Sequence, residues 1–119
     1  MTDTARFLKT VQQLPWFAAL HGATQNGLAR AAVQRSYNSG QVIYVEGEPA
    51  EFVYILESGW VKAVRMTRTG REQAMLFLRP VDVFGHIAVL TGTTYPGTVV
   101  ALEPVSAWAI PASVILDMI

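Results

Sequence analysis

Five glycines divide residues 35–110 into short runs rich in β-branched and aromatic residues, and this spacing restricts the fold more than any other feature. Short strands separated by glycine-containing turns are typical of all-β sandwiches and barrels. In WVKAVRM, apolar and basic residues alternate as in a strand with one buried face. The TRTG that follows predicts a hairpin turn with a glycine at positive φ. We therefore predict a mainly β region over residues 35–110, with turns at Gly40, Gly47, Gly59, Gly70 and Gly85.

Helical patterns precede this region. Residues 4–13 place three apolar side chains on one helical face, those of Phe7, Leu8 and Val11. The LPWF that follows contains Pro15, which has no amide donor, so the first helix should end there. Thr24 is the predicted N-cap of a second helix that reaches about residue 34. The predicted helical part therefore spans residues 4–34.

The C-terminal residues also suggest a helix. Residues 98–102 and 105–110 are the last predicted strands, and Pro111 then takes the first position of a helix. The segment ASVILDMI is almost wholly apolar and has neither a C-cap glycine nor a basic last turn. We predict that residues 111–119 begin a longer helix that packs on a partner; the alternative is that they fold back on the core. The predicted dimer-helix positions are Val114, Ile115, Met118 and Ile119.

Composition argues against several classes of function. The length of 119 residues supports one domain, and nine basic residues balance nine acidic ones, so the chain has no basic footprint for nucleic acid. The absence of cysteine removes thiolate nucleophiles, iron–sulfur clusters and cysteine-based zinc sites. No apolar run reaches the roughly 18 residues needed to span a bilayer, and the N-terminus lacks a signal-peptide core. We predict a cytoplasmic protein without membrane contact.

The sequence offers no catalytic constellation. His21 and His86 are the only histidines, whereas a metal-dependent jelly-roll enzyme needs several histidines and a carboxylate. No acid–base or nucleophile–base pair is evident, so we predict that the chain is not an enzyme and holds no metal. The carboxylates of Glu46, Glu48 and Glu51 suggest a hydrated loop. The three tryptophans are predicted core or dimer-surface residues: Trp16, Trp60 and Trp108.

Several segments resemble a known family. The order of LPWFAAL, the glycine-punctuated strands and PVDVFGHIAVL is similar to the cyclic-nucleotide-binding domain. More narrowly, it resembles the sensor half of bacterial transcription regulators of the catabolite-activator/fumarate–nitrate-regulator (CRP/FNR) superfamily. The resemblance covers about residues 7–118. It implies a double-stranded β-helix (jelly roll) flanked by helices, and a DNA-binding helix-turn-helix beyond the chain end.

Residues 84–101, FGHIAVLTGTTYPGTVVA, take the place of this family's phosphate cassette. Members that bind cyclic AMP have a glutamate after the FG glycine, which holds the ribose, and later an arginine and a small hydroxyl residue, which hold the phosphate. Here those positions are His86, Tyr95 and Pro96, and the segment has no Lys or Arg. Because a buried phosphate without a cation is costly, we do not expect cyclic AMP to bind in the usual way. The predicted residues of this degenerate cassette are Phe84, Gly85, His86, Ile87, Ala88, Tyr95, Pro96, Gly97 and Thr98.

The resemblance implies the effector-sensing and dimerisation domain of a transcription regulator. It would form a homodimer, respond to an unknown small-molecule effector, and reach DNA and RNA polymerase through the full-length protein. The alternative is a sensor module fused to a kinase, transporter or channel. Haem bound at His86 is a further possibility, although no second ligand is indicated. Arg65, Arg68 and Arg71 surround the hairpin turn, which we expect to be solvated; the alternative is a contact with RNA polymerase or the DNA-binding half.

Overall fold

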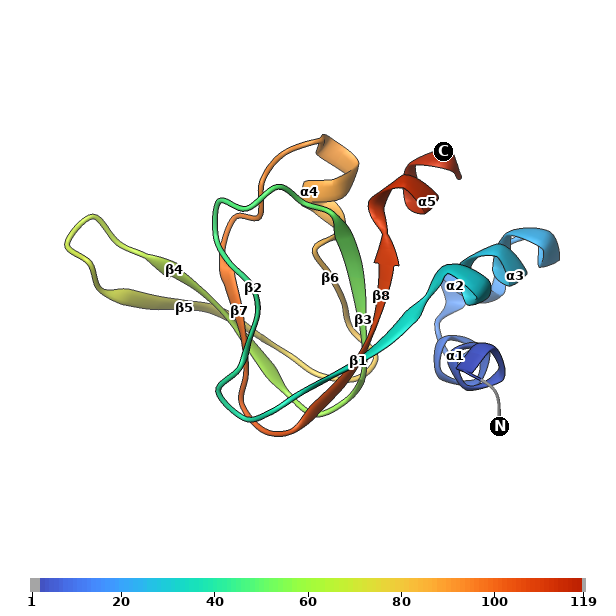
Figure 1. Cartoon of the computed structure of the whole chain (residues 1–119), viewed down its shortest axis with the longest axis horizontal. Helices are drawn as coiled ribbons and strands as arrows, with labels where there is room; N and C mark the ends of the chain where they lie inside the picture. The colour runs from blue at the N-terminus through green and yellow to red at the C-terminus, as the bar shows by residue number, and fades with distance from the viewer. Residues whose placement is uncertain (1–2, 119) are drawn as a thin grey trace.

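The computed structural model describes residues 3–118, so the predicted dimer position Ile119 lies outside the described residues. Within them, eight strands form two antiparallel four-stranded sheets, and helices flank the sheets (Figure 1). The strands are β1 (Val33–Tyr37), β2 (Val42–Tyr44), β3 (Phe52–Ser58), β4 (Val61–Met66), β5 (Glu72–Leu78), β6 (Val83–Phe84), β7 (Thr98–Ala101) and β8 (Val105–Pro111). The helices are α1 (Asp3–Val11), α2 (Pro15–Ala18), α3 (Gly22–Ala31), α4 (His86–Thr91) and α5 (Ala112–Asp117). The prediction of a mainly β jelly roll with flanking helices is confirmed.

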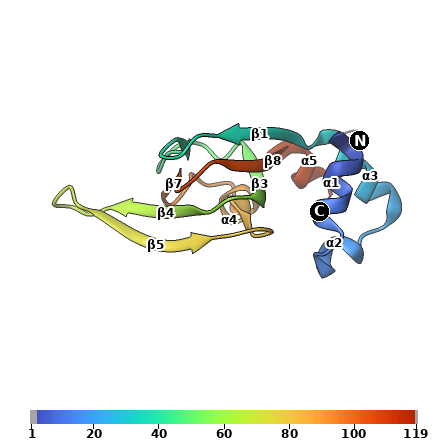
Figure 2. The same ribbon diagram turned by 90° about the horizontal axis from the view of Figure 1, so that it is seen from below.

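The two sheets enclose the main core. One sheet has the order β1-β8-β3-β6 and the other β2-β7-β4-β5, and Figure 2 shows β1 and β8 in a different layer from β4 and β5. From β3, Tyr54 and Leu56 belong to this core, and from β8 Ala107 and Ala109 do so. Tyr54 lies opposite Ala109 and Leu56 opposite Ala107. A small residue opposite a large one fills the space between the sheets without overpacking.

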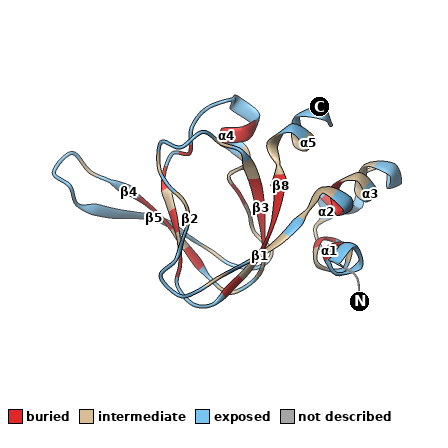
Figure 3. Ribbon diagram, in the orientation of Figure 1, coloured by how far each residue is buried: buried red, intermediate tan, exposed pale blue. Residues whose placement is uncertain are grey.

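The alternate residues of β3 and β8 form a second core with the N-terminal helices. Ile55 and Trp108 face α1 and α2, whose Phe7 and Phe17 are fully buried there. The rings of Phe7 and Trp108 meet edge to face, with centroids 5.4 Å apart. Because both faces of these strands are covered, their sequences FVYIL and AWAI are apolar without alternation. Figure 3 shows the buried residues concentrated on β3 and β8.

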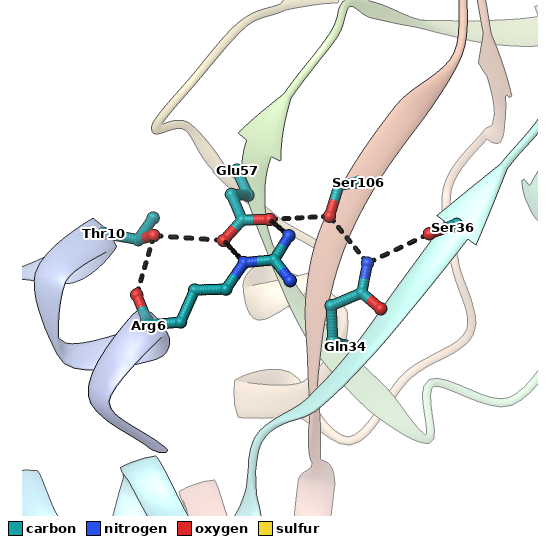
Figure 4. Close-up of polar contacts among 6 residues, drawn as sticks. All are labelled: Arg6, Thr10, Gln34, Ser36, Glu57 and Ser106. Carbon is teal, nitrogen blue, oxygen red and sulfur yellow. Dashed lines mark hydrogen bonds and ion pairs between the residues drawn. The ribbon is translucent and has the colours of Figure 1, made fainter. Parts of the chain in front are cut away.

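A chain of hydrogen bonds also ties α1 to the sheet (Figure 4). At its centre Glu57 accepts a hydrogen bond from the Arg6 Nε at 2.9 Å and another from the Ser106 hydroxyl at 2.7 Å. Partial burial alone would raise the pKa of Glu57, but the hydrogen bonds from Arg6 and Ser106 outweigh it and lower that pKa below its usual value. The six residues of this latch are Arg6, Thr10, Gln34, Ser36, Glu57 and Ser106.

The structure corrects the predicted boundaries of the N-terminal helices. The N-cap of α3 is His21, not Thr24, because the imidazole Nδ1 of His21 accepts the Ala23 amide hydrogen at 3.3 Å. The helix ends at residue 31 and not near 34, since Val33 already pairs with β8. The first helix ends at Val11, before residue 13, and Pro15 begins the short helix α2, where its missing donor costs nothing.

The start of α5 also differs from the prediction. Pro111 ends β8 and is the N-cap, so α5 begins at Ala112, one residue later than predicted. Val114 and Ile115 pack against the second core of the same chain, which β3 and β8 form with the N-terminal helices and which we call the helix-side core. This packing favours the fold-back alternative for these two positions. Leu116 and Met118 are exposed.

The tryptophans and the arginine hairpin have different surroundings. Trp108 is fully buried, as predicted for a core residue, whereas Trp16 and Trp60 are exposed on the surface. The β4–β5 hairpin extends away from the body of the domain (Figure 1). Its three arginines are exposed, as expected for a solvated turn: Arg65, Arg68 and Arg71.

Candidate functional site

The predicted cassette comprises α4, the loop after it and the start of β7. Gly85 precedes α4 at a φ of +79°, a conformation that favours glycine. A Cβ on Gly85 would also lie 3.2 Å from the ring of Tyr95. Gly97 is required by close approach, because a Cβ there would lie 2.8 Å from the carbonyl oxygen of Val64 in β4. The two glycines therefore let the cassette pack closely on the β-roll.

A cavity of about 250 Å³ lies between the cassette and strands β4 and β5. Seven of the nine predicted cassette residues line it: Phe84, Gly85, His86, Ile87, Ala88, Pro96 and Gly97. The sequence analysis missed the other wall residues, which come from distant strands and the end of β5: Tyr44, Ala63, Met75, Leu76, Leu78, Val83 and Val99. The sequence contained one signal for this wall, the apolar run AMLFL. In the structure this run lies on the edge strand β5, where Met75, Leu76 and Phe77 stay exposed.

Tyr95 does not line this cavity, although it takes the position of the family's arginine. Its ring stacks on Tyr44 with centroids 3.7 Å apart. Its hydroxyl donates to the Phe52 carbonyl at 2.7 Å and accepts the Phe52 amide hydrogen at 3.2 Å. Burial raises the pKa of Tyr95, and the hydrogen bond that its oxygen accepts from the Phe52 amide opposes the rise. Tyr95 is therefore a buried structural residue that braces β3 against the cassette.

Thr98 also lies outside the cavity wall. Its hydroxyl accepts the Glu46 amide hydrogen at 2.9 Å. The Glu46 carboxylate in turn accepts the Met66 amide hydrogen at 3.2 Å. Thr98 and Glu46 thus brace the β2–β3 loop against the sheet.

His86 brings the cavity its one unsatisfied side-chain nitrogen. The Nδ1 atom of His86 is buried and has no hydrogen-bond partner among the described residues. The remaining wall side chains are apolar apart from the hydroxyl of Tyr44. A neutral imidazole offers one donor and one acceptor, but Nδ1 itself is closed off from the cavity in this structure, so a bound molecule would reach it only after the ring turned.

The cavity provides no cation for a phosphate. None of the residues that line it is basic. Arg65 in β4 contacts the cassette from outside the cavity: its Nε donates to the Pro96 carbonyl at 3.2 Å. Arg65 is an exposed residue, so it sits in water and not in the cavity. The residues present therefore fit a cyclic phosphate poorly, because its charge would be buried without a partner. Sequence spacing could not place Arg65 here, since it is 31 positions from Pro96.

Two further features bear on function. In the part of the chain that the structure describes, no three metal-ligating side chains lie together. Within residues 3–118, no helix has the length and apolar character needed to cross a bilayer.

The chain is similar in sequence to a known domain family and to proteins that are regulators by name. The family described as "Cyclic nucleotide-binding domain" matches residues 34–119. The global nitrogen regulator of Synechococcus elongatus is 36% identical over 77 residues, which are 63% of this chain and 35% of that protein. The anaerobic regulatory protein of Pasteurella multocida is 28% identical over 85 residues, 71% of this chain and 31% of that protein. The chain thus spans about a third of the length of these relatives.

A solved structure has the same fold. The sensor domain of the transcriptional regulator DNR from Pseudomonas aeruginosa matches with a TM-score of 0.88 and 22% identity. The match covers 98% of this chain and 79% of that domain. At this identity the likeness concerns the fold alone.

Proposed function

The chain belongs to the cyclic nucleotide-binding domain family, and on that premise we propose that it is the effector-sensing and dimerisation domain of a CRP/FNR-type transcription regulator. Bacterial regulators are among the relatives that match it. The observation that carries the proposal is the cassette cavity, which has the place and glycine frame of a ligand site. In this proposal the domain is cytoplasmic, not an enzyme, and acts on DNA and RNA polymerase as a homodimer through the rest of the protein.

The effector in this proposal is a small, uncharged and mostly apolar molecule. Apolar walls favour such a ligand, and the missing cation disfavours a cyclic nucleotide. His86 would fix its orientation: once the ring turns Nδ1 toward the cavity, with the imidazole proton on Nε2, Nδ1 accepts one hydrogen bond from the ligand.

The signal would pass from the cavity to α5. Ile87 and Ala88 of α4 line the cavity, and α4 contacts α5. The first amide of α5, on Ala112, donates to the Glu51 carbonyl at 2.8 Å, which ties this helix to the start of β3. A ligand that favours one position of α4 would therefore favour one position of α5 and shift the population of the DNA-binding state.

Indole tests the effector class, because it is flat, neutral and apolar with one N–H donor. We expect NMR titration to show saturable shifts at the cassette amides. His86→Leu should weaken indole binding by about tenfold, the equivalent of one lost hydrogen bond. The N-methyl derivative of indole has no donor and is the matched control, so its affinity should not change in the variant. Indole affinity that is independent of His86, or no binding at the cassette, contradicts this effector class.

Two further observations separate the remaining alternatives. A helix-turn-helix pattern in the protein sequence after residue 119 supports the regulator, whereas transmembrane spans or a catalytic domain support the fused sensor module. An absorbance scan of protein expressed with a haem supply should show no Soret band. A Soret band that His86→Leu removes would make haem the ligand of this cavity.

A further inference from the structure

Met75 is the extra residue of a β-bulge in the edge strand β5. The pairing of β5 with β4 goes from Ala63–Leu76 directly to Val64–Ala74. Met75 therefore has no partner in β4. An extra residue of this kind bends the strand and re-aims its own side chain, and bulges are frequent beside functional sites for that reason.

The Met75 side chain reaches the cassette. Its sulfur lies 3.0 Å from the point that a Cβ on Gly97 would occupy. The carbonyl oxygen of Val64 lies 2.8 Å from the same point, so the sulfur and this oxygen both pack beside the Cα of Gly97. Met75 also lines the cassette cavity, although the residue remains 42% exposed. It therefore closes one side of the cavity and stays within reach of small molecules in water.

The other methionines that the structure describes lie away from the cavity. The chain has no cysteine and four methionines, so every sulfur in it is a thioether. Met66 is 54% exposed and pairs with Glu72 at the end of β4, and Met118 is 39% exposed at the end of α5. Neither of these two residues lines the cassette cavity. Exposure to an oxidant is thus common to all three, whereas only Met75 among them also contacts the cassette.

We propose that Met75 is an oxidation-sensitive residue of the cassette: hydrogen peroxide converts its thioether to a sulfoxide, and the cavity then binds apolar molecules more weakly. In this step the sulfur donates an electron pair to one peroxide oxygen, an S–O bond forms and the O–O bond breaks. The second oxygen takes the proton of the first and leaves as water, so the sulfur loses two electrons and the peroxide gains them. The effect on ligand binding rests on the proposed function, whereas the oxidation of Met75 and its effect on the cassette do not.

A sulfoxide oxygen is poorly accommodated at this contact. Oxidation converts a flexible apolar side chain into a polar one. Turned toward Gly97, the new oxygen would lie beside the Val64 carbonyl and bring two hydrogen-bond acceptors together. Turned toward the cavity, it would place a polar atom in an apolar wall. If the side chain instead moves into water, the cavity loses that wall, so each arrangement disfavours an apolar ligand.

Treatment of the ligand-free chain with hydrogen peroxide provides the first test. Peptide mass spectrometry measures the sulfoxide at each methionine, while NMR follows the amides of Val64, Gly97 and Thr98. We expect these amides to shift in proportion to the sulfoxide at Met75, and methionine sulfoxide reductases to reverse the shifts. Amides that do not move when Met75 is fully oxidised would overturn the proposal, as would a Met75 that resists peroxide while Met66 reacts.

Two variants assign the shifts to one sulfur. Met75→Leu keeps a similar apolar volume without the sulfur, so peroxide should no longer shift the cassette amides. Met66→Leu removes an exposed sulfur outside the cavity and is the matched control, in which the shifts should remain. Peroxide shifts that persist in Met75→Leu, or that disappear in Met66→Leu, would assign the effect to another residue and overturn the proposal.

The N-methyl derivative of indole measures the effect on the cavity, because it has no donor for a sulfoxide oxygen. Its affinity should fall about tenfold when Met75 is oxidised, and by the same factor in Met66→Leu. In Met75→Leu, peroxide should not change the affinity. An affinity that does not depend on the oxidation of Met75 contradicts the proposal. If the reduced chain does not bind this molecule, the proposed function fails instead, and the amide shifts of the ligand-free chain still decide whether Met75 controls the cassette.

Discussion

The helix-side core and the cassette side of the β-roll are both built from apolar side chains, but only the first is filled. On the helix side, Phe7, Phe17 and Trp108 are fully buried. On the cassette side a cavity of about 250 Å³ remains, and Met75 and Leu76 at its edge are more than 40% exposed. Apolar surface that finds partners within the chain stabilises the fold, whereas apolar surface around an open cavity is available to a ligand.

Each side also contains one buried side-chain nitrogen without a hydrogen-bond partner, and the surroundings of the two nitrogens differ. The Nε1 of Trp108 and the Nδ1 of His86 both lack a hydrogen bond among the described residues. The indole of Trp108 is enclosed by packed side chains of the helix-side core. The imidazole of His86 borders a cavity. A bound molecule can therefore contact the His86 ring and would reach Nδ1 if the ring turned, whereas the indole of Trp108 stays enclosed.

The largest expected effect lies in the filled core. Trp108→Ala should lower the free energy of unfolding by about 3–5 kcal/mol, because it removes a fully buried aromatic side chain and leaves a void. Trp60→Ala is the matched control, and its exposed ring should cost less than about 1 kcal/mol. Urea unfolding measures both. Similar losses in the two variants would contradict the distinction between filled core and surface.

A smaller effect is expected where the cassette meets β4. Gly97→Ala should destabilise the domain by about 1–3 kcal/mol, since the new methyl group would meet the Val64 carbonyl at 2.8 Å. The matched control is Gly27→Ala, which adds a methyl group in open space within α3. Gly92→Ala would not serve, because Gly92 has a positive φ. Thermal unfolding should show Gly27→Ala unchanged or stabilised, because alanine favours a helix. A Gly97→Ala protein as stable as the wild type would refute the close packing of the cassette.

The polar latch of α1 should give a pH-dependent contribution. The pKa of Glu57 is lowered in the folded chain, so its stabilisation is present above the ordinary carboxyl pKa and is lost as pH falls through the lowered value. Glu57→Gln should cost about 1 kcal/mol at neutral pH and flatten the acid limb of the stability curve. Glu72→Gln, which breaks the exposed pair with Lys62, should cost less than about 0.5 kcal/mol. Urea unfolding at several pH values measures both variants. If their free energies of unfolding fell in the same way toward acid pH, the pH-dependent contribution of Glu57 would be contradicted.

The smallest effect on stability is expected at His86. His86→Leu removes a buried nitrogen that has no partner, so the free energy of unfolding should change by less than about 1 kcal/mol in the absence of ligand. Urea unfolding of the variant measures this. A large loss of stability would show that His86 holds the fold and is not kept for a ligand.

The two sides of the β-roll also differ in how much of each could be predicted from the sequence. The glycine turns and the β-rich runs between them are local signals, and they were sufficient for a mainly β fold, whereas the jelly roll itself was implied by the family resemblance. The cassette frame was also predicted from the resemblance, which could be followed there because its residues are contiguous from Phe84 onward. The opposite wall of the cavity was missed, since Tyr44, Met75 and Leu76 are brought there only by the pairing of distant strands.

The role of Tyr95 shows a different limit. Its position predicted the loss of the arginine charge, but not that the ring would turn away from the cavity and stack on Tyr44. That orientation depends on the Phe52 backbone, which offers both a donor and an acceptor to the hydroxyl. A sequence pattern contains no information about such a partner 43 positions away.

Calorimetric titration of the chain with cyclic AMP tests the central claim most directly, namely that the cassette keeps the frame of a phosphate site without its charge. The cavity has no basic residue, so we expect no binding tighter than about 1 mM. Cyclic GMP should behave in the same way, because the missing cation affects the phosphate that both nucleotides share. Binding of either nucleotide with a Kd of about 1 µM would contradict the account and would mean that Arg65 or another group supplies the cation.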